Sequence, residues 1–406
     1  MDHSENIKKN NKYQEDEANS NTNILNKNPN NKGRVWCDGC YDMIHFGHAN
    51  QLRQAKKMGT YLVVGVHTDS EILKNKGPPV FNETERYRMV KGIKWVDEVV
   101  EGAPYSTTIE TLDKYNCEFC VHGNDITLTS EGVDTYAEVK NAGRYKECER
   151  TAGVSTTDLV ERMLQLTKSH HSTTDSFDDE HGKRARTLST DSCGKSPWTR
   201  VSKFIPSTQT LLQFADGVAP KPNDKIVYVS GAFDLFHIGH LSFLEKARKL
   251  GDYLIVGLFE DGVVNAYKGR NHPIMSLHER TLSVLAYKPV SEVIIGAPYI
   301  ITKDLIKNFN ISIVADGSRV QHHHTLDDVD IYKVPKEMGI YELIDSENDM
   351  TTDMIIKRVI ENEKAFKKRN NEKEQKEIAA FKALQKMEQK NVNNSLTNNV
   401  VNLNNY

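Results

Sequence analysis

Residues 34–66 read RVWCDGCYDMIHFGHANQLRQAKKMGTYLVVGV, and residues 226–258 read IVYVSGAFDLFHIGHLSFLEKARKLGDYLIVGL. The two stretches match at an offset of 192 positions. Each passes from an apolar, β-branched run through a glycine-containing turn into a helical pattern, and then into a second apolar run. Strand, helix and strand in this order form the βαβ unit of a parallel sheet. The chain therefore contains the same α/β unit twice.

The repeat continues beyond this first unit. GAPY at 102–105 matches GAPY at 296–299, and Thr-Thr-Asp at 156–158 matches Thr-Thr-Asp at 351–353. Small insertions shift the offset to 194 and then, at the Thr-Thr-Asp motif, to 195. We expect two tandem Rossmann-like, doubly wound parallel-sheet domains, with ligands bound at the carboxyl ends of the strands.

Composition assigns the rest of the chain to tails and linkers. The Asn-, Lys- and Ser-rich stretches hold too few apolar residues to offset the entropy of ordering them. Val201 to Ala215 is more apolar, and we expect part of it to pack on a domain. The predicted division is a disordered tail at 1–33, a first domain at 34–167, a linker at 168–224, a second domain at 225–360, a charged helix at 361–390 and a disordered tail at 391–406.

Charge and hydrophobicity exclude several classes of protein. The formal net charge of the 406-residue chain is −3, so no basic field indicates a nucleic-acid partner. No run of about 18 apolar residues predicts a membrane span, and the first residues lack the apolar core of a signal peptide. We expect a cytoplasmic protein without integral membrane association, whose 6 cysteines are reduced thiols.

Paired histidines stand where the first strand of each repeat leads into its helix. His45 and His48 have i, i+3 spacing, which places both rings on one helical face. Gly47 has no side chain to block a phosphate from the backbone, and a helix N-terminus favours an anion. The imidazoles are placed to hydrogen-bond a phosphate whose charge rises in a displacement reaction. The second copy, at His237 and His240, argues against a coincidental tetrapeptide.

Residues 150–157, RTAGVSTT, form a second candidate anion site. They place a guanidinium, backbone amides and the hydroxyls of Ser155, Thr156 and Thr157 before a helix that begins at Asp158. Hydroxyls at a helix start also serve as N-caps, so a purely structural role stays open for them. Arg150 favours binding of a triphosphate. Lys76 lies in a loop after the second strand, where lysines are usually only solvated, but its repeat partner Lys268 favours a function.

These residues together resemble a known family. The HxGH element after a strand resembles the nucleotidyltransferases that activate a substrate by attack on a nucleotide α-phosphate. Asp38, Lys76, Arg86 and residues 150–157 are similar to the cytidylyltransferase branch, and the resemblance extends over roughly residues 34 to 390. It implies transfer of CMP from CTP to a small phosphorylated amino alcohol, with Mg²⁺ bound to CTP as the one cofactor.

The resemblance also assigns roles to individual residues. The implied catalytic residues are His45, His48, Lys76 and Arg150. The implied nucleotide-binding residues of the first domain are Gly39, Cys40, Gly47, Arg86, His122, Asp125, Thr151, Gly153, Ser155 and Thr156. Those of the second domain are Gly231, Ala232, Phe233, His237, Gly239, His240, Lys268, Asp316, Gly317, Asn348, Thr351 and Thr352.

The amino end of the acceptor requires a carboxylate and an aromatic face or hydroxyl. Asp38 and Tyr105 follow predicted strands and are candidates, although a turn-capping aspartate and a packed tyrosine are the structural alternative. The resemblance implies phosphoethanolamine as the acceptor, because relatives specific for phosphocholine carry a single catalytic domain and this chain has two. Phosphocholine stays open as the alternative, as does the oligomeric state, including a homodimer.

The two halves differ at two charged positions. Ser230 stands where the first half has Asp38, and alignment through Thr-Thr-Asp places Asp345 where it has Arg150. A serine cannot neutralise an ammonium, and an aspartate repels a triphosphate. We therefore expect turnover in the first domain, while the second binds a cytidine nucleotide in a role that the sequence leaves open.

Three further features receive a structural interpretation. The Cys-x2-Cys pairs 37/40 and 117/120 have spacing typical of zinc sites, but their repeat counterparts are apolar, so we expect core cysteines and no metal site. The histidines at 322–324 are interpreted as solvated loop residues. The charged helix predicted from about Thr352 to Lys390 is expected to be solvated and partly docked on the second domain.

Overall fold

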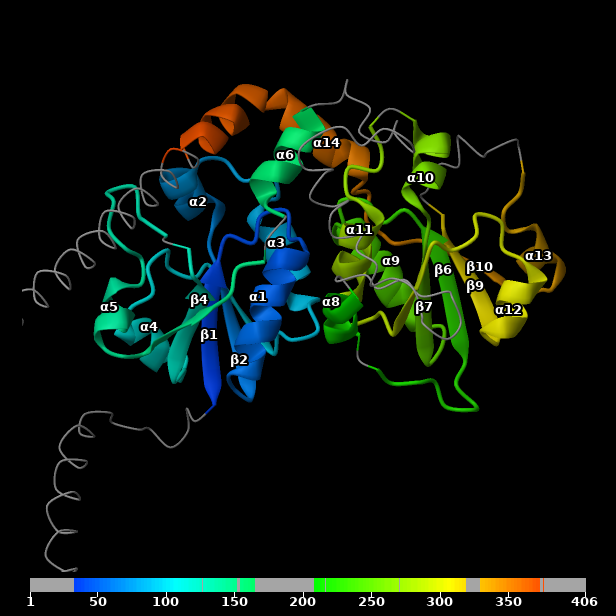
Figure 1. The fold of residues 1–406 in the computed structure, drawn as a ribbon, viewed down its shortest axis with the longest axis horizontal. Coiled ribbons are helices and arrows are strands. Elements are labelled where there is room, and N and C mark those ends of the chain that lie inside the picture. Colours follow the sequence, from blue (N-terminus) through cyan, green and yellow to red (C-terminus); the bar gives the residue numbers. More distant parts are fainter. Residues whose placement is uncertain are drawn as a thin grey trace, which may run out of the picture.

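The chain folds into two α/β units that lie side by side (Figure 1). The computed structural model describes residues 33–125, 127–151, 154–164, 208–215, 217–269, 271–318, 329–372 and 375. The predicted tails, apart from Gly33, and residues 168–207 of the predicted linker lie outside these ranges, as do His322 to His324.

Each unit is built on a five-stranded parallel sheet. The first sheet has the order β3-β2-β1-β4-β5, and the second has the equivalent order β8-β7-β6-β9-β10. In each sheet the chain first extends to one side of the first strand and then crosses to the other side, which makes a topological switch point beside that strand. The predicted fold class, two tandem doubly wound parallel sheets, is confirmed.

The first unit contains β1 (Arg34–Gly39), α1 (Phe46–Lys57), β2 (Tyr61–Val66), α2 (Asp69–Lys76), α3 (Glu83–Lys91), β3 (Glu98–Glu101), α4 (Ile109–Lys114), β4 (Phe119–Gly123), α5 (Ala137–Asn141), β5 (Tyr145–Cys148) and α6 (Thr156–Leu164). The second contains β6 (Ile226–Gly231), α9 (Ile238–Arg248), β7 (Tyr253–Leu258), α10 (Asp261–Lys268), α11 (Leu277–Leu285), β8 (Glu292–Ile295), α12 (Lys303–Asn308), β9 (Ile311–Gly317), α13 (Lys333–Glu337), β10 (Tyr341–Ile344) and α14 (Thr352–Glu361).

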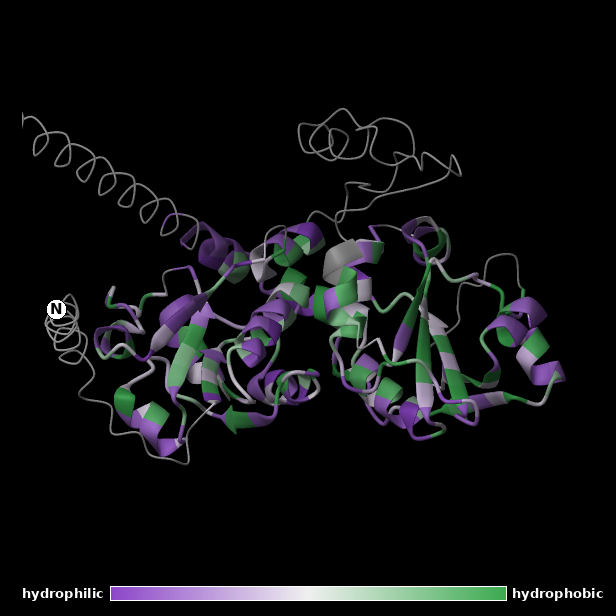
Figure 2. Cartoon of the chain, turned by 60° about the horizontal axis from the view of Figure 1, so that its bottom comes forward, coloured by the Kyte–Doolittle hydropathy of each residue, from purple (hydrophilic) through white to green (hydrophobic). Residues whose placement is uncertain are grey.

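The central strands are apolar on both faces because helices cover both sides of each sheet. Val63 and Val64 are adjacent in β2 and point to opposite faces, yet neither is exposed to solvent. Figure 2 shows the hydrophobic strands inside each unit and the hydrophilic residues mostly on the outer helices and loops. This burial explains why continuous apolar runs, rather than alternating patterns, mark the strands in the sequence.

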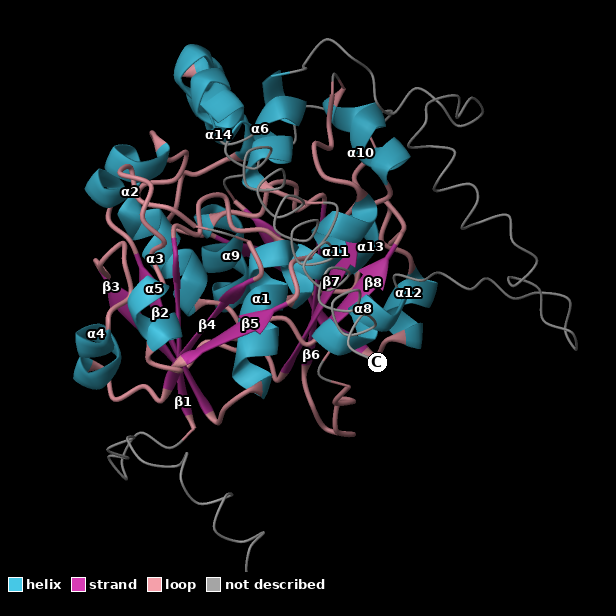
Figure 3. Cartoon of the chain, turned by 60° about the vertical axis from the view of Figure 1, so that its left-hand side comes forward, coloured by secondary structure: helices cyan, strands magenta, loops and turns pink. Residues whose placement is uncertain are grey.

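The units meet through an interface whose contacts are repeated by approximate twofold symmetry. Arg162 of α6 pairs with Glu279 of the second unit, and Arg358 of α14 pairs with Glu85 of the first, with shortest distances of 2.8 Å in both cases. Helices α6 and α14 pack against each other, as Figure 3 shows. The matching pairs explain how two copies of one unit form a closed interface rather than an open chain of domains.

Helix α8 (Thr208–Phe214) packs at this interface. Phe214 is fully buried, and its ring lies 5.1 Å from that of Trp95 and 5.9 Å from the guanidinium of Arg53. The expectation that part of the 201–215 segment packs on a domain is therefore confirmed. The segment ties the first unit to the second just before β6 begins.

The chain after α14 continues as a helix over residues 363–372 and crosses to the first unit (Figure 1). Arg369 donates hydrogen bonds to the carboxylate of Asp42 and to the carbonyl of Pro78. Phe366 is buried against apolar residues of the first unit. The predicted partial docking on the second domain is confirmed for α14, where Thr352 donates to the Asp234 carbonyl, whereas residues 363–372 dock on the first unit instead.

Candidate active site

A cavity of about 670 Å³ opens at the carboxyl ends of β1 and β4, beside the switch point of the first sheet. Both predicted anion sites line this cavity, and the predicted residues around it come from four separate segments of the chain. Among the predicted residues, those that line it are Asp38, Gly39, Cys40, Gly47, His45, His48, Lys76, His122, Asp125, Arg150, Thr151, Ser155 and Thr156.

His45 and His48 form the start of α1. His45 is the N-cap, and its Nδ1 accepts a hydrogen bond of 3.1 Å from the backbone N–H of Gly47. His48 Nδ1 faces the backbone N–H of His45 at 3.4 Å, and the two rings stack with centroids 4.0 Å apart. Because Nδ1 accepts in both rings, the neutral imidazoles carry their protons on Nε2, as donors. A Cβ at Gly47 would lie 2.9 Å from the His45 ring, so only glycine fits between the histidines.

Two basic side chains come from opposite sides of the cavity. Lys76 is the last residue of α2, and its ammonium lies 6.0 Å from the centre of the Tyr105 ring. Arg150 follows β5, whose carboxyl end lies at the same edge of the sheet as that of β4. Both side chains are largely exposed, so they are accessible to an anion that enters the cavity.

The start of α6 is held against the first unit by its own hydroxyls. Ser155 accepts a hydrogen bond from the backbone N–H of Asp158, as an N-cap does, and Thr156 donates one of 2.9 Å to the carbonyl of Asp42. Thr151 accepts from the side-chain amide of Asn50 at 2.9 Å. These bonds place the helix N-terminus at the cavity wall, where it favours an anion. The predicted Gly153 lies outside the described residues.

His122 and Asp125 lie at the end of β4. Burial lowers the pKa of His122, so its ring is neutral near pH 7. Burial raises the pKa of Asp125, but the nearby His122, Arg150 and Lys76 outweigh it and leave the pKa below its ordinary value. Arg150 and Lys76 therefore bring positive charge close to Asp125, which suits a polyanionic ligand.

Two predicted site residues do not line the cavity. Arg86 is fully buried and donates to the carbonyls of Phe81 and Cys40 and to the carboxylate of Asp69. Arg86 therefore holds the turn after β1 in place without lining the cavity itself. Tyr105 is also buried, and its ring packs 5.0 Å from that of His67.

Asp38 is buried at the end of β1, beside residues that sequence reasoning missed. Its Oδ1 accepts a hydrogen bond of 3.1 Å from the hydroxyl of Tyr136, while its Oδ2 has no hydrogen-bond partner among the described residues. Burial, only partly opposed by hydrogen bonds and by Lys76, raises the pKa of Asp38 to about 7. Within the described residues, Oδ2 is therefore the one oxygen of this carboxylate that is left without a hydrogen bond.

His67, which follows β2, faces this carboxylate. Its Nε2 lies 3.9 Å from Asp38 Oδ2, and its Nδ1 lies 3.2 Å from the carbonyl oxygen of Ala103. A carbonyl only accepts, so Nδ1 carries the proton of the neutral ring, and burial lowers the pKa of His67 to about 4. His67 Nε2 and Asp38 Oδ2 are then two hydrogen-bond acceptors 3.9 Å apart. A group with more than one N–H placed between them can donate to both.

Comparison with known proteins agrees with this geometry. A family model described as cytidylyltransferase-like matches residues 36–162 and 228–376. Ethanolamine-phosphate cytidylyltransferase of Mus musculus is 56% identical over 374 residues, which cover 87% of this chain and 92% of the relative. This chain belongs to the ethanolamine-phosphate cytidylyltransferase family. The Dictyostelium discoideum member is 50% identical and covers 85% of this chain and 95% of its own length.

Relatives named for the other amino alcohol match only in part. Choline-phosphate cytidylyltransferase A of Mus musculus is 42% identical over 135 residues, which cover 32% of this chain and 36% of that protein. The two ethanolamine-phosphate relatives, in contrast, match across both units of this chain, over 92% and 95% of their own length. No helix in the described part of the chain is long and apolar enough to cross a membrane.

The second domain of this family member repeats the histidine cap. His237 accepts from the Gly239 N–H at 3.1 Å, and its ring stacks on that of His240 at 3.8 Å. Burial lowers the pKa of His237 to about 3 and places that of His240 well below its ordinary range. The other predicted residues lie at the same edge of the second sheet: Gly231, Ala232, Phe233, Lys268, Asp316, Gly317, Asn348, Thr351 and Thr352.

Several of these second-domain side chains take part in local hydrogen bonds. Asn348 Oδ1 accepts from the Met350 N–H at 3.0 Å, Thr351 caps α14, and Thr352 donates to the carbonyl of Asp234 at 3.0 Å. A Cβ on Gly239 would lie 2.5 Å from the Met350 carbonyl oxygen. This carbonyl closely approaches the N-terminus of α9, where the first domain has the Val154 side chain instead.

The structure corrects the alignment of the two halves by one residue. The strand β5 begins at Tyr145 and its equivalent β10 at Tyr341, an offset of 196. Arg150 therefore corresponds to Ser346, and the prediction that Asp345 takes its place was wrong. Asp345 is instead the counterpart of Glu149, which also lines the first cavity. The second domain therefore lacks the guanidinium of Arg150, as predicted, but a neutral serine and not an aspartate takes its position.

The cysteines with zinc-like spacing lie mostly in the core. Cys37 belongs to the apolar cluster on one face of the first sheet, whereas Cys117 and Cys120 belong to the cluster on the other face. All three are fully buried, while Cys40 is partly exposed at the cavity. The interpretation of the buried three as small hydrophobic residues agrees with this packing.

Proposed function

We propose that the first domain transfers CMP from CTP to phosphoethanolamine, giving CDP-ethanolamine and pyrophosphate, a step toward phosphatidylethanolamine. The observation that carries this proposal is the convergence of His45, His48, Lys76 and Arg150 on one cavity that also contains Asp38. Membership of the ethanolamine-phosphate cytidylyltransferase family supports the same reaction.

The reaction needs positioning and charge stabilisation rather than a covalent enzyme intermediate. A phosphate oxygen of phosphoethanolamine attacks the α-phosphorus of CTP, and the bond from that phosphorus to the bridging oxygen of pyrophosphate breaks. The Nε2–H groups of His45 and His48 would donate to the α-phosphate oxygens as their charge rises. Lys76 and Arg150 would stabilise the departing pyrophosphate.

Mg²⁺ is expected to enter as part of the CTP complex. In such sites Mg²⁺ is held by substrate phosphates and one or two carboxylates rather than by an all-protein cage. Asp125 and Glu149 are carboxylates at the cavity wall that suit a secondary role of this kind.

The end of β1 suits a primary ammonium group. Asp38 Oδ2 and His67 Nε2 are acceptors 3.9 Å apart, and an ammonium with three N–H groups can donate to both. A trimethylammonium group has no N–H to donate, so it would leave both acceptors unpaired. Phosphoethanolamine therefore fits this pair, and phosphocholine does not.

Turnover of the purified full-length protein with each acceptor tests the proposal. We expect kcat/KM to favour phosphoethanolamine over phosphocholine by about 100-fold or more, because a site built for hydrogen bonds strongly rejects an analogue that lacks them. The CDP-linked product and pyrophosphate would be measured by mass spectrometry and a coupled phosphate assay. A preference for phosphocholine, or no product with either, would overturn the assignment.

A further inference from the structure

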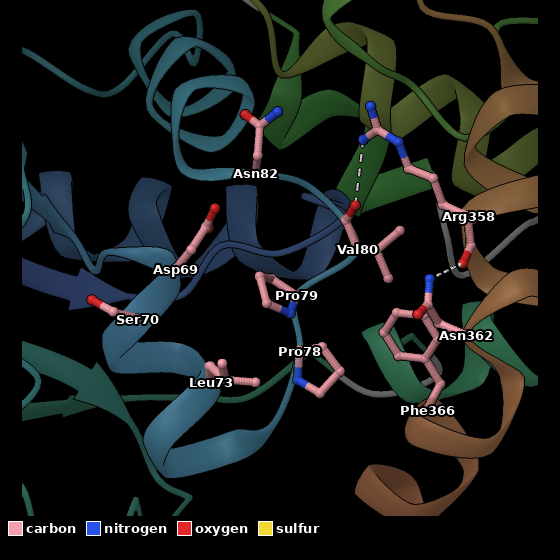
Figure 4. Close-up of a pocket in the computed structure, with 10 residues that line it drawn as sticks. All are labelled: Asp69, Ser70, Leu73, Pro78, Pro79, Val80, Asn82, Arg358, Asn362 and Phe366. Carbon is pink, nitrogen blue, oxygen red and sulfur yellow. Dashed lines mark hydrogen bonds between the residues drawn. The ribbon is translucent and has the colours of Figure 1, made fainter.

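The helix at residues 363–372 brings part of the second domain's chain to the first domain's cavity. Phe366 is 2% exposed and lies beside Pro78 and Pro79, on the loop between α2 and α3 (Figure 4). One turn earlier, the side-chain amide of Asn362, the C-cap residue of α14, donates to the Arg358 carbonyl and caps the end of that helix. Arg369 is thereby held at the cavity wall.

Only one nitrogen of the Arg369 guanidinium is used in this docking. Nη1 donates to Asp42 Oδ2 at 3.2 Å and to the Pro78 carbonyl at 2.8 Å. Nε and Nη2 make no hydrogen bond to any residue in the described part of the chain, although the side chain is only 12% exposed. The guanidinium therefore keeps several N–H donors at a cavity that already contains Lys76 and Arg150.

The second domain needs no such outside residue. Asp234, the counterpart of Asp42, accepts from the backbone N–H groups of Ile274 and Met275, just as Asp42 accepts from those of its own loop. His272 Nδ1 lies 3.6 Å from the Asp234 carboxylate. In the first domain the position of His272 is occupied by Pro78, which has no side-chain donor, and Arg369 supplies a side-chain N–H to the aspartate instead.

We propose that Arg369 binds the β- and γ-phosphates of CTP, so that the end of the second domain completes the first domain's active site. Asp42, which anchors Arg369, also accepts the Thr156 hydroxyl through its carbonyl, so the guanidinium stands next to the start of α6. This is the helix N-terminus that faces the triphosphate in the proposed reaction. The inference rests on the proposed binding of CTP in this cavity.

Calorimetric titration of CTP and CMP into the full-length protein tests the inference. Arg369→Ala should weaken CTP binding about 10- to 100-fold, the loss expected for charge-assisted hydrogen bonds. It should leave CMP binding unchanged, because CMP lacks the β- and γ-phosphates. Arg369→Lys should fall between Ala and wild type. Lys364→Ala is the matched control, since it removes the same charge from an exposed position on the same helix.

The outcomes separate the possible roles of Arg369. Selective loss of CTP affinity, absent in the Lys364 variant, supports direct phosphate binding. An equal loss for CTP and CMP would assign Arg369 a merely structural role and overturn the inference, as would unchanged affinity for both. If the wild-type protein binds neither nucleotide, the proposed function itself fails, which is a distinct result.

Discussion

Asp38→Asn should stabilise the free protein while it impairs turnover. Asp38 is buried, its Oδ2 has no hydrogen-bond partner among the described residues, and its pKa is raised to about 7. The unfolded value for an aspartate is about 3.9. A carboxyl group whose pKa is raised by folding destabilises the folded state as pH rises from the unfolded pKa to the folded pKa. Asparagine keeps the shape and removes this cost.

The size of both effects follows from the same side chain. A shift of about 3 pKa units corresponds to an upper limit of about 4 kcal/mol in the free energy of unfolding, fully present above pH 7. The gain from Asp38→Asn should therefore shrink as pH falls from 7 to 4 and vanish where the wild-type carboxyl is itself protonated. Loss of the charge partner for a buried ammonium should cost about 3 kcal/mol, or about 100-fold in kcat/KM for phosphoethanolamine.

Two measurements check this pair of effects. Denaturant unfolding at pH 7.5 and pH 4.5 compares stability, and initial rates at varied phosphoethanolamine, with CTP saturating, compare turnover. The KM for CTP should not change, because Asp38 faces the acceptor. Reduced stability at pH 7.5, or full activity of the variant, would refute the view that Asp38 is an unpaired charge that awaits the substrate amine.

Two other predictions concern the histidines and the interface. His45→Ala should abolish product formation with little loss of stability. His237→Ala should reduce product formation less, because the second domain has no counterpart of Arg150. Equal residual activity in the two variants would contradict this prediction. Glu85 and Arg358 form a bidentate pair between the domains, with the arginine side chain about one-third exposed. A double-mutant cycle with alanine should give a coupling energy of about 1 kcal/mol after allowance for solvent screening, and a value near zero would show that the pair does not hold the domains.

The parts of the fold and site that are duplicated could be predicted from the sequence. The matched stretches at 34–66 and 226–258 located β1, α1 and β2 and their equivalents to within a few residues. The same comparison located His45 and Lys76, because both have counterparts in the second half. Matching copies is informative where both keep the same local geometry, such as a histidine cap or a buried parallel strand.

Residues that differ between the halves were missed for that reason. His67 corresponds to Phe259, so the repeat gave it no weight, although it directly follows β2. Parallel strands end at one edge of a sheet, and β2 is the neighbour of β1, so this rule would have placed His67 near Asp38. Arg369 had no comparable signal, because it meets Asp42 across 327 positions of sequence.

The error at Asp345 has a local cause. Matching the identical Thr-Thr-Asp letters aligned Thr156 with Thr351, but the structure aligns residues by their role at the helix start. Ser155 and Thr351 are the residues whose hydroxyls cap the helices, and Thr156 and Thr352 donate to equivalent carbonyls. Capping geometry therefore fixed the register that the shared letters misplaced by one residue.

A crystal structure of the protein with CTP and Mg²⁺ tests the central claim most directly. We predict a nucleotide in the first domain's cavity, with the α-phosphate within hydrogen-bond distance of the Nε2 atoms of His45 and His48 and the outer phosphates beside Lys76 and Arg150. A triphosphate bound elsewhere, or found only in the second domain, would contradict it.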